Sequence, residues 1–112
     1  MGKLRNLRTG VVLATDVAIA DTPGARELGL LARDVVHGDD GLWLAGCTEV
    51  DTFGMRAEID VVFLDDASRV LATYRRIPPN HRVIRCVHAA IAVQLGIARD
   101  RDVRHGDVLE LD

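Results

Sequence analysis

The run from residue 59 to residue 64 (Ile-Asp-Val-Val-Phe-Leu) constrains the fold most, because Asp60 is its only polar residue. In an extended strand the odd-numbered side chains of this run point to one side, and Asp60 points to the other with its even-numbered neighbours. A strand that is apolar on both sides lies in the middle of a sandwich or barrel rather than at an edge. A carboxylate in such a strand needs hydrogen-bond donors, because an unpaired buried charge is costly.

Short apolar runs separated by turn residues recur along the chain. Residues 10–20 predict one strand or two short ones, and the four-residue stretch 65–68, rich in Asp and Ser, predicts a hairpin between its flanking runs. The other expected strands are 42–44, 50–55, 59–64, 70–75 and 108–111, together with 83–87 and 89–93, which are either two short strands or one bent strand.

One segment carries helix signals. Asp21 and Thr22 precede Pro23, which suits the first helical position, and a stripe of Leu28, Leu31 and Ala32 follows at helical spacing. Residues 96–102 predict a further helical turn. We therefore expect a mainly β fold, a small antiparallel β-sandwich or barrel-like domain with one short helix. The domain is expected to span residues 10–112, with residues 1–9 as an N-terminal extension.

Composition points to an ordinary globular domain of 112 residues. No stretch approaches the roughly 18 apolar residues of a membrane helix, and the charged N-terminus has no apolar segment typical of a secretory signal. We expect a cytoplasmic, soluble monomer that does not associate with membranes. Cys47 and Cys86 are the two cysteines, and we expect them not to form a disulfide.

Charge is unevenly distributed. Residues 67–99 contain six Arg and no acidic residue, so they carry +6 while the whole chain carries −3, which leaves −9 for the rest. Such a segment, especially 69–88, could dock a protein partner or an anionic ligand. Alternatively, strand pairing places these arginines beside acidic residues. A sequence pI near 5.7 argues against a nucleic-acid binder, and we expect none.

Asp60 is the centre of the candidate site. It could anchor a polar binding pocket, or it could be a structural anchor that caps backbone N–H groups or pairs with Arg56 or Arg33. The candidate binding residues are Asp60, Thr52, Asp51, Met55 and Arg56.

Other reactive side chains fit no established pattern. Cys47, His81, Cys86 and His88 do not have the spacing of a closed zinc site or of a defined nucleophilic pair. The acidic pairs at 39–40 and 65–66 lack the ligand spacing of a calcium loop and fit turns. We therefore expect no bound metal, no cofactor and no catalytic residue.

Three blocks of the sequence resemble one family. Residues 52–65 closely resemble the block Thr-Phe-Gly-Met-Arg-Phe-Pro-Ile-Asp-Val-Val-Phe-Leu-Asp, residues 29–33 resemble Gly-Leu-Met-x-Arg, and residues 41–44 resemble Gly-Met-Leu-Phe. These blocks are typical of the domain of unknown function 192 family. The resemblance implies a small β-sandwich or barrel-like fold with a short helix, and no established activity. This chain departs from the family pattern at Asp51, Glu58 and Ala92, where the family usually has His, Pro and Glu.

The function expected from these features is binding rather than catalysis. Acid–base or nucleophilic catalysis needs at least two positioned reactive groups, and the sequence displays only Asp60 clearly. We expect a non-catalytic binding or accessory domain whose partner is a small molecule or a protein. The alternatives are a small hydrolase-like enzyme that uses Asp60 and Asp51, and a protein-docking module that uses residues 69–88.

Overall fold

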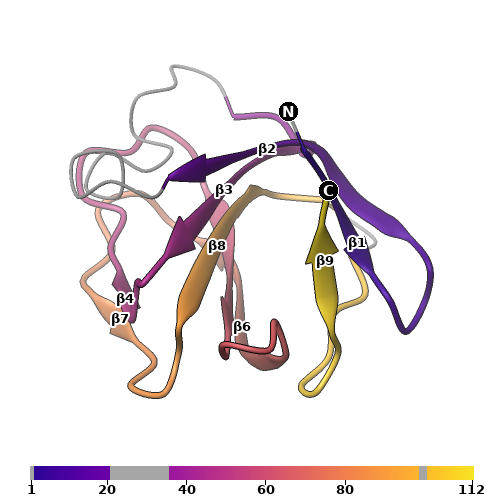
Figure 1. The fold of residues 1–112 in the computed structure, drawn as a ribbon. Coiled ribbons are helices and arrows are strands. Elements are labelled where there is room, and N and C mark those ends of the chain that lie inside the picture. The colour runs from indigo at the N-terminus through magenta and orange to yellow at the C-terminus, as the bar shows by residue number, and fades with distance from the viewer. Residues whose placement is uncertain (1, 21–35, 99–100) are drawn as a thin grey trace.

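The computed structural model of the chain describes residues 2–20, 36–98 and 101–112, and these contain nine strands and no helix (Figure 1). The strands are β1 (Gly2–Asn6), β2 (Val12–Ala20), β3 (Asp40–Ala45), β4 (Glu49–Val50), β5 (Ile59–Leu64), β6 (Val70–Ile77), β7 (Ile84–Arg85), β8 (Ile91–Gly96) and β9 (Leu109–Leu111).

Seven strands form one curved sheet in the order β6-β5-β8-β3-β2-β1-β9, and β4 pairs with β7 in a separate two-stranded ribbon. The ladders are antiparallel except that β2 and β3 run parallel. The sheet is open, with β6 and β9 as its edges, so a barrel-like fold is not confirmed. One isolated antiparallel bridge, between Arg69 and Val108, brings these two edges together at one point.

The mainly β fold and the β5–β6 hairpin are confirmed. Ser68 N–H donates to the carbonyl of Asp65 within the hairpin turn. The expected helix after Asp21 is not confirmed, because it falls on residues 21–35, outside the described residues. Residues 97, 98, 101 and 102, which belong to the expected helical turn, are not helical.

Three other expectations are corrected. Gly2–Asn6 are not an extension but form β1, between β2 and β9, with Leu4 and Asn6 fully buried. The expected strand over 50–55 stops at Val50, because the chain turns at Gly54, whose φ is +81°. The 83–87 strand shortens to β7, and the strand expected over 89–93 begins at Ile91 and continues to Gly96 as β8.

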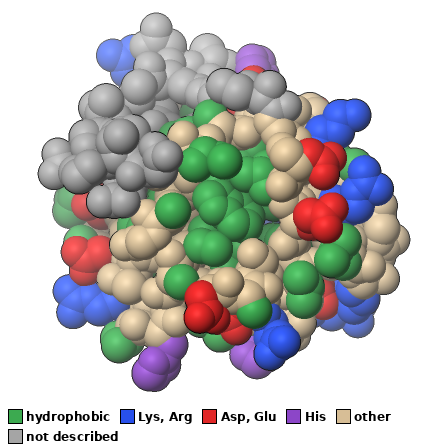
Figure 2. Space-filling view, viewed as in Figure 1, with side chains coloured by type: hydrophobic (Ala, Val, Ile, Leu, Met, Phe, Trp, Pro, Cys, Tyr) green, Lys and Arg blue, Asp and Glu red, His purple; other side chains and the backbone are tan. Residues whose placement is uncertain are grey.

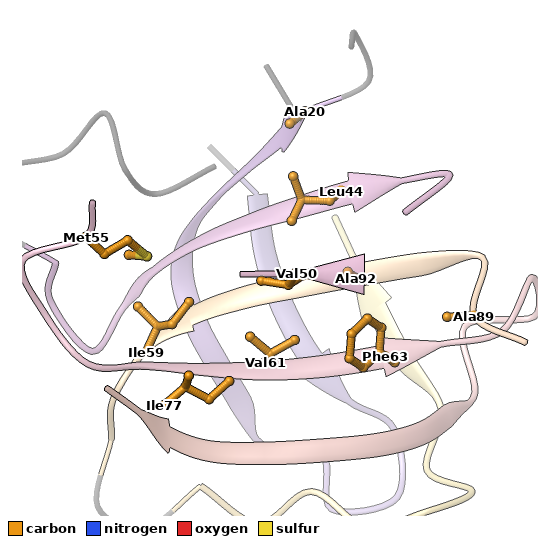
Figure 3. Packing of buried hydrophobic residues seen from close by; sticks show 10 residues of the cluster. All are labelled: Ala20, Leu44, Val50, Met55, Ile59, Val61, Phe63, Ile77, Ala89 and Ala92. Atoms are coloured by element: carbon orange, nitrogen blue, oxygen red, sulfur yellow. The ribbon is translucent and has the colours of Figure 1, made fainter. Parts of the chain in front are cut away.

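The two faces of β5 pack against different apolar clusters, as its sequence predicts, and all six of its residues are buried. Its odd-numbered residues join the ribbon-side cluster, which includes Val50 of the ribbon and is drawn in Figure 3. Val62 and Leu64, on the other face of β5, join the inner cluster. The other members of the inner cluster are Leu4, Leu13, Ala14, Val17, Val70, Val93, Leu95 and Leu109.

Candidate functional site

Asp60 lies at a β-bulge between β5 and β6. Ile59 pairs with Ile77 and Val61 pairs with Tyr74, so two residues of β6, Arg75 and Arg76, lie opposite Asp60 alone. Arg76 has a φ of +53°, and its N–H donates to Asp60 Oδ1 at 2.8 Å. The carboxylate therefore caps the backbone that the bulge leaves out of the ladder.

The second oxygen of Asp60 is paired with Arg101. Arg101 Nη1 lies 2.7 Å from Asp60 Oδ2, and each of the two side chains is only 2% exposed. Nε of the half-exposed Arg75 lies 3.4 Å from the same oxygen. Asp60 is thus enclosed by a buried arginine, a backbone donor and a second arginine at the surface.

Arg101 also joins three segments of the backbone. Its guanidinium donates to the carbonyls of Gly96 at 2.8 Å, Gly38 at 2.9 Å and Leu13 at 3.4 Å. Burial lowers the pKa of Arg101, and the charge of Asp60 opposes that effect. Asp60 shares a face of β5 with Val62 and Leu64, and Arg101 donates to the carbonyl of Leu13, so the buried pair borders the inner cluster. We call this end of the cluster the sealed end.

The structure places the other expected site residues away from this ion pair. Met55 is buried in the ribbon-side cluster, on the opposite face of the sheet from the Asp60 carboxylate. Asp51 and Arg56 are exposed. The arginine that pairs with Asp60 is Arg101, not Arg56, and Arg33 lies outside the described residues.

Thr52 connects its own loop to residues 78–81 by hydrogen bonds. Its hydroxyl donates to the carbonyl of Pro78 at 2.6 Å and accepts from the N–H of His81 at 2.8 Å. Its carbonyl accepts from Asn80 N–H, and the side-chain oxygen of Asn80 accepts from Gly54 N–H. These hydrogen bonds link the Thr-Phe-Gly block to residues 78–81, and Phe53 is exposed.

An open pocket on the other side of the inner cluster was not expected from the sequence. Its volume is about 420 Å³, and we call it the Trp43 pocket. Figure 2 shows hydrophobic side chains gathered at the centre of this view. The residues that line the pocket are Leu7, Ile19, Trp43, Ala67, Ser68, Val108, Leu109, Glu110 and Leu111.

The pocket and the Asp60–Arg101 pair lie toward opposite ends of the same strands. In β2, the carbonyl of Leu13 accepts from Arg101, whereas Ile19 lines the pocket six residues further on. In β5, Asp60 is near the start, and the turn that contributes Ala67 and Ser68 follows the end. The sequence marks Ile19 and Trp43 only as members of strands, because the pocket that they line also needs residues far away in the sequence.

A third polar cluster anchors the turn that precedes β9. Asp107 accepts from Arg8 Nε at 2.7 Å, from Asn6 Nδ2 at 2.9 Å and from the N–H of Arg104 at 2.9 Å. The Arg8 hydrogen bond is the largest cause that lowers the pKa of Asp107 to about 2. Asp102 forms a further ion pair with Arg8 at 3.2 Å.

The remaining candidates are the two cysteines and the histidine and acidic side chains. Cys47 and Cys86 are free, partly buried thiols that pack against the ribbon-side cluster. Within residues 2–20, 36–98 and 101–112, no three His, Cys, Asp or Glu side chains are grouped to hold a metal ion. In the same ranges, no helix is long and apolar enough to cross a membrane.

Comparison with known proteins identifies the family. The sequence matches the DUF192 family, described as Uncharacterized ACR, over residues 5–111. The chain belongs to this family. No curated protein matches it.

Two crystal structures share the DUF192 chain's fold. A candidate transcription regulator from Sinorhizobium meliloti 1021 has a TM-score of 0.77 and 20% identity, over 98% of this chain and 91% of its own. A protein of unknown function from Novosphingobium aromaticivorans DSM 12444 has a TM-score of 0.74 and 16% identity, over 97% of this chain and 82% of its own. At these identities the likeness establishes the fold alone.

Proposed function

We propose that this DUF192 domain is a non-catalytic binding domain and that the Trp43 pocket is its binding site. The observation that carries the proposal is the pocket itself. Its volume of about 420 Å³ is in the range of ligand sites, and its open lining combines apolar side chains, including one tryptophan, with polar surface. Ser68 is a polar residue at the same surface.

The surroundings of Asp60 favour a binding function at another site over catalysis by Asp60. Both carboxylate oxygens of Asp60 already accept hydrogen bonds from Arg76 and Arg101, and the side chain is 2% exposed. A general acid or base must come within hydrogen-bond distance of its substrate. The buried ion pair therefore favours a structural role for Asp60 over the hydrolase-like alternative.

The arginine segment 69–88 supplies less free charge than its composition indicates. Arg85 pairs with Glu49 at 2.9 Å, and Arg75 donates to the carbonyls of Ala98 and Arg101. This pairing favours interleaved charges over a dedicated docking face. The cytoplasmic location, the monomeric state and the lack of nucleic-acid binding stay predictions from the sequence.

A fluorescence titration tests the proposal, because Trp43 is the only tryptophan of the chain and lines the pocket. The probe is N-phenyl-1-naphthylamine, a neutral apolar dye whose emission rises in apolar surroundings. We expect saturable binding with energy transfer from Trp43. Ile19→Ser should weaken dye binding about fivefold, because it removes an apolar contact worth about 1 kcal/mol.

Val87→Ser is the matched control. Val87 is 72% exposed and Ile19 is 62% exposed, but Val87 lies outside the pocket. The control should bind the dye like the wild-type protein. Absence of saturable binding to the wild type, or equal affinity in all three proteins, would contradict the proposal.

A further inference from the structure

The outer edge of β9 carries backbone groups that point away from the sheet. Toward β1, Leu7 N–H donates to the carbonyl of Val108, and Asp112 N–H donates to the carbonyl of Lys3. In an antiparallel ladder the residues that bond to a given neighbour alternate, so Val108, Glu110 and Asp112 face β1. Leu109 and Leu111 therefore direct their N–H and C=O groups away from β1.

The hydrogen-bond partner of Leu109 confirms that its backbone groups point away from β1. Its N–H donates outward to the carbonyl of Ser68 at 3.0 Å, where the β5–β6 turn touches β9. Beyond that contact, the C=O of Leu109 and the N–H and C=O of Leu111 have no hydrogen-bond partner among residues 2–20, 36–98 and 101–112. Leu109 is only 1% exposed and lies beside Ser68, so the groups available at the edge of the sheet are the N–H and C=O of Leu111.

The Trp43 pocket runs along this edge. Four consecutive residues, Val108 to Leu111, line it. Successive side chains of a strand point to opposite faces, so a pocket that touches all four reaches the edge of the strand and not one face only. Across the pocket, Ile19 and Trp43 are neighbours in the parallel β2–β3 ladder and offer apolar surface.

We propose that the Trp43 pocket binds an extended peptide segment that adds as a strand to the outer edge of β9. The segment accepts a hydrogen bond from Leu111 N–H and donates to the carbonyl of Leu111. Its apolar side chains lie against Ile19 and Trp43. The inference rests on the proposed function, since it names the ligand class of the same pocket.

The geometry favours a peptide over a compact apolar molecule for one physical reason. An exposed strand edge presents donors and acceptors at the spacing of another strand's backbone, so pairing supplies affinity while pockets for alternate side chains supply selectivity. The two outward groups of Leu111 match one hydrogen-bonded residue pair of an added strand.

The test uses the acetylated and amidated peptide Lys-Val-Leu-Val-Lys as the probe, followed by Trp43 fluorescence and by the backbone amide NMR signal of Leu111. Two variants of this probe carry N-methyl groups, one on the leucine and the other on both valines. Because alternate N–H groups of an added strand face its partner, only one variant should lose affinity. The expected loss is about threefold to tenfold, the range for one to two net hydrogen bonds.

A pair of protein variants checks the same edge from the other side. Leu111→Pro removes the outward N–H, which an edge strand tolerates, and Leu111→Val keeps it. The proline variant should bind the peptide about threefold or more weakly than the valine variant. A thermal melt shows that both variants are folded.

The outcomes separate the two proposals. Dye binding together with a difference between the two N-methylated peptides supports strand addition. Dye binding without peptide binding, or with equal affinity for both N-methylated peptides, overturns strand addition and leaves the binding function standing. If neither dye nor peptide binds, both proposals fail.

Discussion

The two ends of the inner cluster differ in how they are shielded from solvent. At the sealed end, Arg101 and Asp60 fill the opening with paired charges that are almost inaccessible to water. At the open end, Ile19 and Trp43 leave apolar surface exposed around a pocket. Buried charges tolerate little change because each needs its partner, whereas exposed apolar side chains can be replaced at little cost to folding. The difference predicts that the sealed end carries stability and that the open end carries function.

The largest effect is expected at Arg101. Arg101→Met leaves the Asp60 carboxylate buried without its main partner, which should lower the free energy of unfolding by about 3–5 kcal/mol. Urea denaturation measures the loss. The double variant with Asp60→Leu removes both charges and should regain a large part of the stability. An Arg101→Met protein as stable as the wild type would contradict the role given to the sealed end.

Variants of Asp60 refine the same point. Asp60→Asn keeps the shape and the acceptor for Arg76 N–H but leaves Arg101 without a counter-charge. It should therefore be nearly as destabilising as Asp60→Ala in the same denaturation experiment. A mild Asn variant beside a severe Ala variant would mean that the backbone cap, and not the ion pair, dominates.

A smaller loss is expected for Gly96→Ala beside the sealed end. A Cβ at Gly96 would overlap the main-chain carbonyl of His37, so the backbone has to move. The expected cost is about 1–3 kcal/mol by urea denaturation. Gly10→Ala is the control, because Gly10 has φ +72° with no atom near the new Cβ and should lose only about 1 kcal/mol. Equal losses would show that the sealed end is not tightly packed.

Acid should loosen the turn that leads into the open end. The pKa of Asp107 is lowered to about 2 in the folded protein, below its ordinary value of 3.8. A depressed pKa contributes stability above pH 3.8, and that contribution is lost as the pH falls from about 4 to about 2. Thermal melts across this range should show a steeper decline for the wild type than for Asp107→Asn. Parallel declines would contradict the assignment.

The smallest effect on folding is expected at the open end itself. Ile19→Ser should change the free energy of unfolding by no more than about 0.5 kcal/mol, because the side chain is 62% exposed. Urea denaturation beside Val87→Ser provides the measure. A loss above about 1.5 kcal/mol would show that Ile19 belongs to the core, and the contrast between the two ends would fail.

The sequence predicts the centre of this fold better than its boundary. The two-sided burial of β5 and the turn at Asp65–Ser68 follow from local alternation and turn chemistry, and both are present. The strand β1 was missed because Gly2–Asn6 alternate apolar and polar residues only weakly, and their pairing partners, β2 and β9, include the last strand of the chain. Local patterns hold no information about such distant pairing.

The candidate site shows the same limit. The burial of Asp60 and its need for an arginine or backbone donor follow from its place in an apolar strand. Its partner does not, because Arg101 comes from a segment 41 residues away with no apolar pattern around it. The Trp43 pocket is missed for a related reason, since five segments that are separate in the sequence contribute to its lining.

The pairing of β1 with β9 also determines when this protein can fold. Leu4 lies opposite Leu111, so the strand at one end of the sequence is completed by the strand at the other. Contacts between distant residues slow folding, because the chain must close long loops before it gains their stabilisation. During synthesis, the sheet lacks its β9 edge until residue 111 has left the ribosome. Until then β1 exposes an unpaired edge and the inner cluster lacks Leu109. Nascent chains that still lack β9 should therefore be more prone to aggregate.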